Sequence, residues 1–451
     1  MRRLYDILLS KSRLTIGLIG FVFIILLVNR DSWRRPDAIR HDMSSYYGYL
    51  PAAIIYHDLS LSFAQDPKFG DQYTWTNPAE NGRVFRMTMG IAVMEAPFFI
   101  IADTYVQLTG KERNAYTPPY FLFTFLGTLF YLIWGLHYLF LLLRGRFNPT
   151  IALLTCLAIA FATNLYYYTL DEALMSHTFN FFLYSALLFY SIKWHDTPKI
   201  SHALKLGIII GLLTLIRPIH SIAILIPLMY DGHLKSKWQL LLKHPTQMLV
   251  VAIISCLVVL PQLFYWKYLS NNWIVYTYGD EHFFFNDPQI LRGLFSFRKG
   301  WFIYTPIAIC AVFGIFPLIR KDKSLLLVFI TLIPLYIYVI FSWWCWWYGG
   351  SFGSRPMIDI LPLFAFPLAA FFFWLQKRLK LGLYLGVGIL FMLSALNSYQ
   401  TRQYKSTLLH WDGSTWSLYQ KIFLDNHWPK DYDSLIDPPD YEAAKEGKRD
   451  I

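Results

Sequence analysis

The chain has 451 residues, of which 55% are hydrophobic, 19% aromatic and only 15% charged. An average soluble domain carries about 25% charged residues, and the apolar runs here are too long to be buried in soluble cores. We therefore expect one polytopic membrane domain, and we attribute the net charge of +11 to its cytoplasmic loops, not to nucleic-acid binding.

The first apolar stretch, residues 14–28, follows four basic residues, and no small-residue cleavage motif comes after it. It predicts an uncleaved signal anchor with its N-terminus in the cytoplasm. Further apolar segments predict ten more spans, near residues 118–143, 149–168, 171–193, 202–217, 219–231, 246–266, 301–319, 324–342, 356–375 and 380–397. The predicted fold is an all-α polytopic bundle of about eleven transmembrane helices.

One segment, residues 87–108, is apolar but contains Glu95 and Asp103. The later basic clusters all lie in the cytoplasm, as the positive-inside rule requires, only if this segment does not span. We therefore expect it to be an interfacial helix on the outer face, away from the bilayer centre. In this topology residues 29–117 form the first extracytoplasmic loop, residues 1–397 the catalytic membrane domain and residues 398–451 an extracytoplasmic tail.

Four arginines lie in the predicted outer loop, where the positive-inside rule disfavours them: Arg30, Arg34, Arg35 and Arg40. We expect them to contact anionic lipid headgroups. In the tail, residues 409–419 carry enough aromatic side chains to pack on the outer loops. Residues 441–451 are charged and predict disorder.

A carboxylate and closely spaced tyrosines stand just beyond the first span. Asp42 precedes Tyr46 and Tyr47, and an ionised group at a membrane face is uncommon unless it has a function. Asp42 is our first candidate for chemistry on a lipid-borne substrate, with both tyrosines as substrate contacts. The alternative is an N-cap for a helix over residues 46–56. Asp58, at the far end of that helix, is expected to be structural.

Two carboxylates and a histidine stand at the start of the span predicted at 171–193. Asp171, Glu172 and His177 could hold a cation or a diphosphate-bound metal, and an acidic helix start favoured by the dipole is the alternative. We favour the dipole role for Asp171 and substrate contact for Glu172 and His177. A divalent cation stays open as the cofactor, with Asp42 and Glu172 as its ligands.

Basic and aromatic residues mark three more points on the outer face. Arg217 precedes Pro218 within apolar sequence, which suits a phosphate held bidentately or a structural pair with Asp171 or Glu172. Arg298 and Lys299, at the mouth of a span, suit phosphate contacts or interfacial anchoring. Four tryptophans in five residues exceed what anchoring needs, and Trp346 and Trp347 could stack on a sugar; Arg355 follows them.

Together these residues resemble the GT-C glycosyltransferase superfamily, which includes the protein O-mannosyltransferases and the aminoarabinose transferases of lipid A. The likeness covers about residues 1–397 in topology. It rests on five features of the sequence: Asp42 with its tyrosines, Ser176-His177 at the head of a span, the Arg217-Pro218 break, the Leu-Phe-Ser-x-Arg-x-Gly entrance at 294–300, and the Phe-Gly-x-Arg-Pro…Leu-Pro exit at 352–362. Such enzymes take a sugar from a polyprenyl-phosphate carrier on the outer face and have juxtamembrane helices in the first loop.

The resemblance implies roles for single residues. Asp42 matches the catalytic acid of the first loop, Glu172 a second acidic group, and Arg217, Arg298 and Arg355 basic positions that could meet the carrier phosphate. Two features depart from the family. The acid stands alone where many members have an Asp-Glu or Asp-x-Asp pair, which leaves metal dependence in doubt. No large soluble domain follows the last span, which argues against an oligosaccharyltransferase.

The expected function is inverting glycosyl transfer from a polyprenyl-phosphate sugar to a glycan, lipid or protein acceptor. Asp42 would act as base, and Arg217 with Arg298, Lys299 or Arg355 would stabilise the leaving phosphate. We prefer the inner membrane of a bacterium as the location. The alternatives are a polytopic transporter or lipid flippase, with ionisable groups near the midplane, and a non-enzymatic membrane assembly factor.

Overall fold

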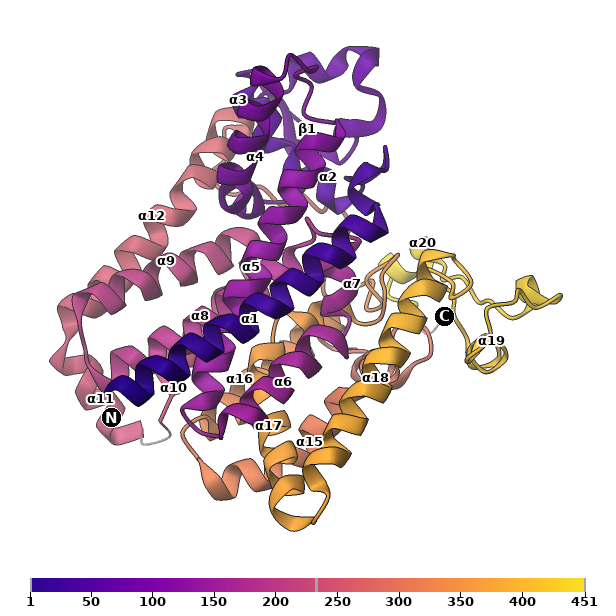
Figure 1. Cartoon of the computed structure of the whole chain (residues 1–451). Coiled ribbons are helices and arrows are strands. Elements are labelled where there is room, and N and C mark those ends of the chain that lie inside the picture. Colours follow the sequence, from indigo (N-terminus) through magenta and orange to yellow (C-terminus); the bar gives the residue numbers. More distant parts are fainter. Residues whose placement is uncertain (1, 232–233, 450–451) are drawn as a thin grey trace. The chain divides into compact units, whose positions relative to one another are not determined.

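The structure is a computed structural model that describes residues 2–231 and 234–449, and it is mostly helical, as predicted (Figure 1). The chain divides into two compact units. Unit 1 comprises residues 1–138, 168–228 and 233–279, and unit 2 comprises residues 139–167, 229–232 and 280–451. Three of the boundaries fall inside helices, in α5 (Pro118–Arg144), α7 (Leu165–Leu170) and α10 (Leu225–Met229).

Unit 1 consists of long helices and a short strand pair. Besides most of α5, its helices are α1 (Arg2–Arg30), α2 (Asp42–Tyr47), α3 (Tyr49–Ile54), α4 (Gly90–Leu108), α8 (Ser176–Asp196), α9 (Ile200–Ile216), α10 (Leu225–Met229), α11 (Leu234–Lys243) and α12 (Pro245–Ser270). Its 3-10 turns are η1 (Ser32–Arg34), η2 (Ser62–Gln65), η3 (Pro67–Tyr73) and η4 (Pro218–Ile224), and its strands are β1 (Thr76–Ala79) and β2 (Gly82–Phe85).

Helix α9 packs along α12 and also contacts α8 and α4 (Figure 1). Two glycines allow its backbone to approach α12 closely. A Cβ at Gly207 would lie 3.0 Å from the carbonyl oxygen of Val251, and one at Gly211 3.0 Å from that of Ser255. Small residues at a helix crossing bring the two backbones into contact, which is typical of helices packed inside a membrane.

Strands β1 and β2 form an antiparallel hairpin that the sequence analysis did not predict. It is anchored on the end of α12: the Asn81 amide donates to the carbonyl of Leu269 at 2.9 Å, and the Tyr265 hydroxyl accepts from the Phe85 amide at 3.2 Å. These bonds fix where the chain leaves the hairpin, at Arg86.

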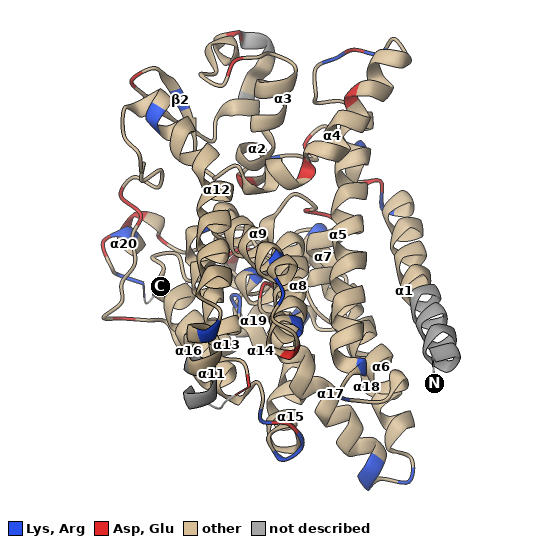
Figure 2. Ribbon diagram, turned by 90° about the vertical axis from the view of Figure 1, so that its left-hand side faces the viewer, with Lys and Arg blue, Asp and Glu red and all other residues tan. Residues whose placement is uncertain are grey.

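Unit 2 contains the remaining helices and the tail. Its helices are α6 (Pro149–Phe161), α13 (Ile290–Phe295), α14 (Trp301–Tyr304), α15 (Ile307–Lys321), α16 (Leu326–Ser342), α17 (Leu361–Arg378), α18 (Gly382–Lys405), α19 (Trp416–Ile422) and α20 (Tyr441–Lys445), with 3-10 turns η5 (Arg355–Ile358) and η6 (Tyr432–Ser434). Helix α17 packs against α15, α6 and α18. Figure 2 shows Lys and Arg gathered at the turn between α17 and α18.

Every segment predicted to span contains helix, but the helix lengths do not support eleven spans. Within residues 2–231 and 234–449, four helices are long and apolar enough to cross a membrane, namely α4, α5, α12 and α18. In the described part of the chain, five further apolar helical segments have only 10–17 residues, including residues 16–30 of α1. Two predicted spans are interrupted, 149–168 between α6 and α7 and 301–319 between α14 and α15. The expected eleven is therefore corrected to four helices of membrane-spanning length.

Helix α4 is one of these four, although we expected its residues to lie at the interface because of their carboxylates. Both carboxylates face the interior of unit 1. Asp103 accepts hydrogen bonds from Arg113 at 2.8 and 2.9 Å and from the Tyr120 hydroxyl at 2.7 Å. Glu95 is 0% exposed and lies against Gly127, where a Cβ would come within 2.6 Å of its carboxyl. The cost of exposing these groups to lipid thus no longer argues against a spanning α4.

The tail is an ordered part of unit 2. Helix α18 continues past residue 397 to Lys405, so the predicted domain boundary falls inside a helix. Residues 441–449 include α20 and the side chain of Arg449, which is 0% exposed. The predicted disorder of this segment is wrong for residues 441–449, and residues 450 and 451 lie outside the described residues.

Candidate functional site

Asp42 is the first residue of α2, and the N-cap position belongs to His41. His41 has a left-handed φ of 52° and makes no side-chain capping bond. The N-cap interpretation of Asp42 is therefore wrong. The helix expected over residues 46–56 is divided at Gly48 into α2 and α3. The half-buried Asp42 carboxylate stands at the start of a short helix whose other residues are buried.

The two tyrosines that follow Asp42 have different surroundings, although both are 0% exposed. The Tyr46 hydroxyl accepts a hydrogen bond from Nε of Arg217 at 3.1 Å. The Tyr47 hydroxyl donates to the carbonyl of Ala115 at 2.6 Å, its ring packs on Phe99, and burial raises the pKa of this phenol well above its ordinary value. Tyr46 thus joins a polar group, whereas Tyr47 anchors α2 in the core.

Arg217 is placed by the proline that follows it. A residue before proline is driven out of the α region, and Arg217 is extended (φ −152°, ψ 124°), so α9 ends at Ile216. The segment after β2 packs on this helix end: the Thr88 hydroxyl donates to the carbonyl of Ile216 at 2.9 Å, and a Cβ at Gly90 would lie 2.6 Å from the Ile216 nitrogen. The end of α9 and the exit of the hairpin are therefore held together.

Arg86, at the hairpin exit, is a neighbour that the sequence analysis missed. Its guanidinium lies 5.1 Å from the centroid of Trp75 and 5.2 Å from that of Tyr278, and its carbonyl accepts from the Thr277 hydroxyl at 2.7 Å. The available signal was an arginine directly before the apolar segment 87–108.

Asp42, Tyr46, Arg86, Arg217 and Tyr278 form one group, which we call the Asp42 cluster. Burial raises the pKa of the Tyr278 hydroxyl; the ionisable groups that act on it are Tyr46, Arg217, Asp42 and Arg86. The cluster contains two guanidinium groups and one carboxylate, so its cations outnumber its anion. Such a group can hold a phosphate beside a carboxylate, and charge-assisted bonds from arginine make that contact strong.

The acidic turn before α8 differs from the expected helix start. Helix α8 begins at Ser176, so Asp171 lies outside its first turn and the dipole interpretation of this residue is wrong. Asp171 is 4% exposed; it forms an ion pair with Arg30 and accepts from the Ser32 hydroxyl at 2.7 Å. Half-buried Glu172 lies in the same turn, and the buried ring of His177 contacts Tyr168 edge-on at 5.2 Å.

Three of the four outer-loop arginines form ion pairs with aspartates, and their contact with lipid headgroups stays a prediction. Beyond Arg30, Arg34 lies 3.1 Å from Asp31, and Arg40 lies 2.7 Å from Asp37. Neutralisation by neighbouring aspartates explains how basic residues are kept in a loop that the positive-inside rule places outside. Arg35 is exposed.

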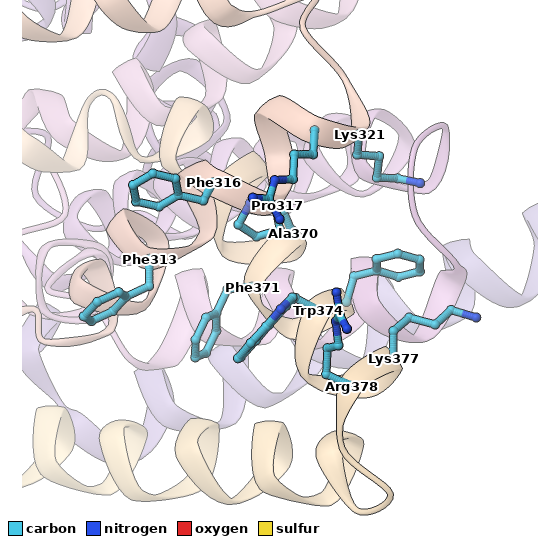
Figure 3. A pocket seen from close by; sticks show the side chains of 11 residues that line it. Phe313, Phe316, Pro317, Lys321, Ala370, Phe371, Trp374, Lys377 and Arg378 are labelled. Atoms are coloured by element: carbon cyan, nitrogen blue, oxygen red, sulfur yellow. The ribbon is translucent and has the colours of Figure 1, made fainter.

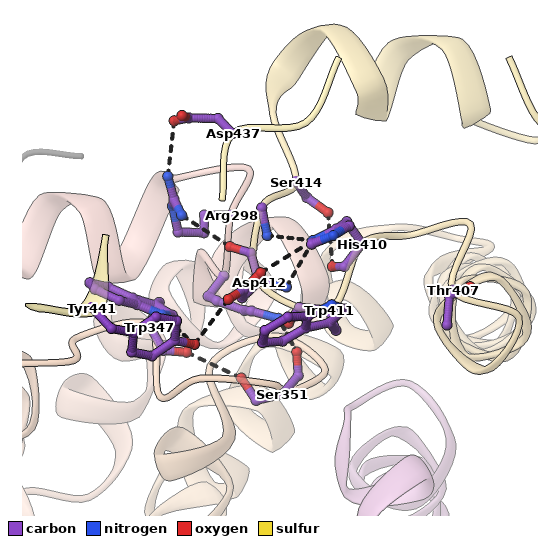
Figure 4. Close-up of polar contacts among 12 residues, drawn as sticks. Arg298, Trp347, Ser351, Thr407, His410, Trp411, Asp412, Ser414, Asp437 and Tyr441 are labelled. Atoms are coloured by element: carbon purple, nitrogen blue, oxygen red, sulfur yellow. Dashed lines mark hydrogen bonds and ion pairs between the residues drawn. The ribbon is translucent and has the colours of Figure 1, made fainter. Parts of the chain in front are cut away.

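In unit 2, Arg298 and Lys299 bind the tail (Figure 4). Arg298, 7% exposed, contacts Asp437 at 3.0 Å and donates to the carbonyl of Asp412 at 3.1 Å. Lys299, 3% exposed, donates to the carbonyls of Ser351 and Trp411. A basic residue that anchors a helix at the membrane interface points toward lipid headgroups, whereas both of these side chains are buried. The interfacial-anchor interpretation is therefore wrong for both residues.

The end of the tail covers Trp346 and Trp347. Trp347 is 1% exposed and donates to the Tyr441 hydroxyl at 3.5 Å, and that hydroxyl in turn donates to Asp412 at 2.9 Å (Figure 4). Trp346 is 2% exposed and donates to the carbonyl of Arg449 at 3.3 Å. Stacking of either ring on a sugar would require the tail to move.

Arg355 completes a basic group in unit 2. Burial lowers the pKa of Lys299 to about 7, with the nearby charges of Arg355 and Arg298 acting in the same direction and Asp412 opposing them. Arg355 is only half-buried and is therefore the most accessible cation of the three. Asp412 and Asp437 were missed by the sequence analysis, which treated the tail only as a source of packing aromatics.

The structure thus brings Asp42, Tyr46 and Arg217 together in unit 1 and Arg298, Lys299, Arg355 and Trp347 together in unit 2. In the part of the chain that the structure describes, no group of three or more His, Cys, Asp or Glu side chains is arranged to hold a metal ion. Comparison with family models, curated proteins and solved structures finds no match for this chain.

Proposed function

We propose that the protein is an inverting glycosyltransferase that moves a sugar from a polyprenyl-phosphate carrier to a glycan, lipid or protein acceptor. The observation that carries the proposal is the Asp42 cluster, where one half-buried carboxylate lies among Tyr46, Arg217, Arg86 and Tyr278. Inverting transfer needs a carboxylate base and a cationic site for the departing phosphate, and this cluster contains both.

In the proposed step the acceptor hydroxyl oxygen attacks the anomeric carbon from the face opposite the phosphate. The proton of the acceptor hydroxyl passes to the Asp42 carboxylate. The bond between the anomeric carbon and the phosphate oxygen breaks, and the phosphate leaves with the bonding electron pair. Arg217 and Arg86 stabilise its negative charge. Preorganised donors at a developing charge contribute about 10²–10³ in rate each, so the two arginines together supply a large share of the rate enhancement.

The membrane setting is part of the proposal. We place the active site at the outer face of a bacterial inner membrane, in a bundle of the GT-C type with α2 and α3 as juxtamembrane helices. The four helices of spanning length support only the membrane location. Within this proposal Arg355 is a further phosphate contact, whereas Arg298 and Lys299 hold the tail.

The test is sugar transfer from a panel of short-chain polyprenyl-phosphate sugars in detergent, without nucleotide sugars. Asp42→Asn removes the base and keeps the side-chain shape, so we expect donor binding to persist while turnover is lost. Asp37→Asn is the matched control, because Asp37 lies in the same loop and its exposed side chain forms an ion pair with the surface arginine Arg40. Full turnover by the Asp42→Asn protein would refute the mechanism.

Glu95 favours a second candidate, a transporter. This carboxyl is 0% exposed inside α4, a helix of membrane-spanning length, and neither of its oxygens has a hydrogen-bond partner among the described residues. An ionisable group inside a membrane helix is costly and is often functional. Substrate flux driven by a pH gradient in liposomes, abolished by Glu95→Gln with no transfer from any donor, would replace the transferase with the transporter.

A further inference from the structure

A cavity of about 790 Å³ opens between the C-terminal halves of α15 and α17, in unit 2 and apart from the residues discussed above (Figure 3). Its walls come from two short stretches, residues 313–321 and 370–378. The two helices are held in close contact beside it, because a Cβ at Gly314 would collide with the carbonyl of Pro367.

One part of the cavity is lined by four cations, all of them exposed: Arg320, Lys321, Lys377 and Arg378. Among the described residues that line it, none is acidic. The carboxylate next in sequence, Asp322, contacts Arg146 at 2.6 Å. Lys321 and Lys377 lie over the same ring, with ammonium groups 4.8 and 5.7 Å from the centroid of Phe373. No acidic side chain of the described lining therefore balances these four positive charges.

The other part of the cavity is aromatic and faces outward. Phe313 is 64% exposed, Phe316 74% and Trp374 43%, and Phe371 stacks on Trp374 with centroids 6.4 Å apart. Figure 3 shows the rings of Phe313, Phe316 and Phe371 at one end and the ammonium groups of Lys321 and Lys377 at the other. The cavity thus changes from apolar to cationic along its length.

We propose that this cavity binds an anionic phospholipid whose headgroup lies on the four cations and whose acyl chain lies along Phe313, Phe316 and Trp374. Basic cavities between membrane helices at the cytoplasmic end recognise anionic headgroups, and four cations suit a headgroup with two phosphates, as in cardiolipin. A soluble anion would leave the aromatic end without a role, and a zwitterionic lipid would leave the positive charge unbalanced. The site does not depend on the proposed transferase activity.

The experiment is native mass spectrometry of the whole delipidated protein in neutral detergent, titrated with cardiolipin, phosphatidylglycerol, phosphatidylcholine or soluble glycerophosphate. We expect cardiolipin to bind most tightly and glycerophosphate not to bind. The variant R320Q/K321Q/K377Q/R378Q should bind cardiolipin at least about tenfold more weakly, since each basic residue near a headgroup contributes several-fold. The control K193Q/K199Q/K205Q/K243Q removes the same number of charges from unit 1 and should bind like wild type.

Phe316→Ser tests the aromatic end separately and keeps the proposal testable if the quadruple variant does not fold. It should weaken cardiolipin binding while the preference for cardiolipin over phosphatidylcholine persists. Unchanged cardiolipin binding by the quadruple variant would show that its cations only orient the chain in the membrane and would overturn the proposal. Equal binding of glycerophosphate and cardiolipin would overturn the lipid assignment.

Discussion

Nε of Arg217, at the end of α9, lies 3.1 Å from the hydroxyl of Tyr46 in α2, and this hydrogen bond joins residues that are 171 positions apart in the chain. The bond holds the guanidinium against α2, the helix that begins at Asp42. Tyr46 is 0% exposed, so its hydroxyl is a fixed acceptor. An arginine positioned before substrate arrives needs little reorganisation during the reaction, which is the condition for effective electrostatic stabilisation.

The first prediction concerns this pair. Arg217→Ala removes a phosphate contact and should lower turnover by about 100-fold or more, while Tyr46→Phe removes only the residue that positions it and should cost about tenfold. Steady-state transfer from a polyprenyl-phosphate sugar measures both. Arg35→Ala, an exposed arginine of the same loop, is the control and should keep full turnover. Equal losses for Arg217→Ala and Arg35→Ala would show that the position of Arg217 is not what matters and would contradict the assignment.

The second prediction is a pH dependence at Asp58. Burial alone would raise the pKa of this carboxyl. Hydrogen bonds from the side chains and amides of Ser60 and Ser62 outweigh that effect and lower the pKa to about 2. A carboxyl with a depressed folded-state pKa stabilises the fold above its unfolded pKa of about 3.9, and this contribution disappears as the pH falls toward 2.

Thermal unfolding between pH 2 and pH 6 checks this dependence. Asp58→Asn should lower the unfolding free energy by about 1 kcal/mol at pH 6, the typical loss for hydrogen bonds to a partly solvated charged group, and should make no difference near pH 2. A variant that differs from wild type by the same amount at both pH values would contradict the assignment.

The third prediction concerns the end of the tail. Arg449 is 0% exposed, contacts Asp287 at 2.9 Å and donates to the carbonyls of Trp343 at 3.2 Å and Ser342 at 3.4 Å. Arg449→Gln should destabilise unit 2 by about 2–3 kcal/mol, because it removes a buried charged group from its partners.

Limited proteolysis of the tail and thermal unfolding measure the effect. Lys448→Gln is the matched control, since the Lys448 side chain is 72% exposed and forms an ion pair with Glu446 at the surface. We expect faster cleavage for Arg449→Gln and unchanged cleavage for Lys448→Gln. Identical cleavage of the two variants would mean that the tail does not depend on this arginine.

The fourth prediction compares the two carboxyls of α4. Glu95 has no hydrogen-bond partner among the described residues, so Glu95→Gln, which is neutral and of similar shape, should leave the unfolding temperature unchanged or raise it. Asp103→Asn should lower it, because Arg113 and Tyr120 lose a charged acceptor worth about 1.5–3 kcal/mol per bond. A larger destabilisation by Glu95→Gln would show that this carboxyl has a partner after all.

Part of the candidate site was predictable from local sequence. Arg217 drew attention because an arginine before proline inside apolar sequence has no ordinary surface role, and Asp42 because it follows the first predicted span. Arg86 and Tyr278 could not be found in that way, since each is a common residue in a loop. Their role comes from the hairpin β1–β2, which packs on α12 and turns Arg86 toward Tyr278.

The error in the number of spans has a physical cause. Hydropathy detects apolar segments, but it does not distinguish a helix of membrane-spanning length from two shorter pieces joined by a turn, as at α6 and α7. The tail was misjudged for a related reason. Its charge suggested a solvated chain, whereas Arg449 and Asp437 satisfy their charges on Asp287 and Arg298 of the same unit.

The amino-acid sequence by itself determined that the protein is mostly helical, where its long apolar helices lie and where polar residues interrupt apolar runs, because hydropathy and proline breaks act over neighbouring residues. Only the tertiary structure decided which polar groups meet. Asp171 pairs with Arg30, Tyr46 binds Arg217, and Arg298 binds the tail. Buried polar groups must find partners wherever the packed chain brings them, and that choice is made by residues distant in sequence.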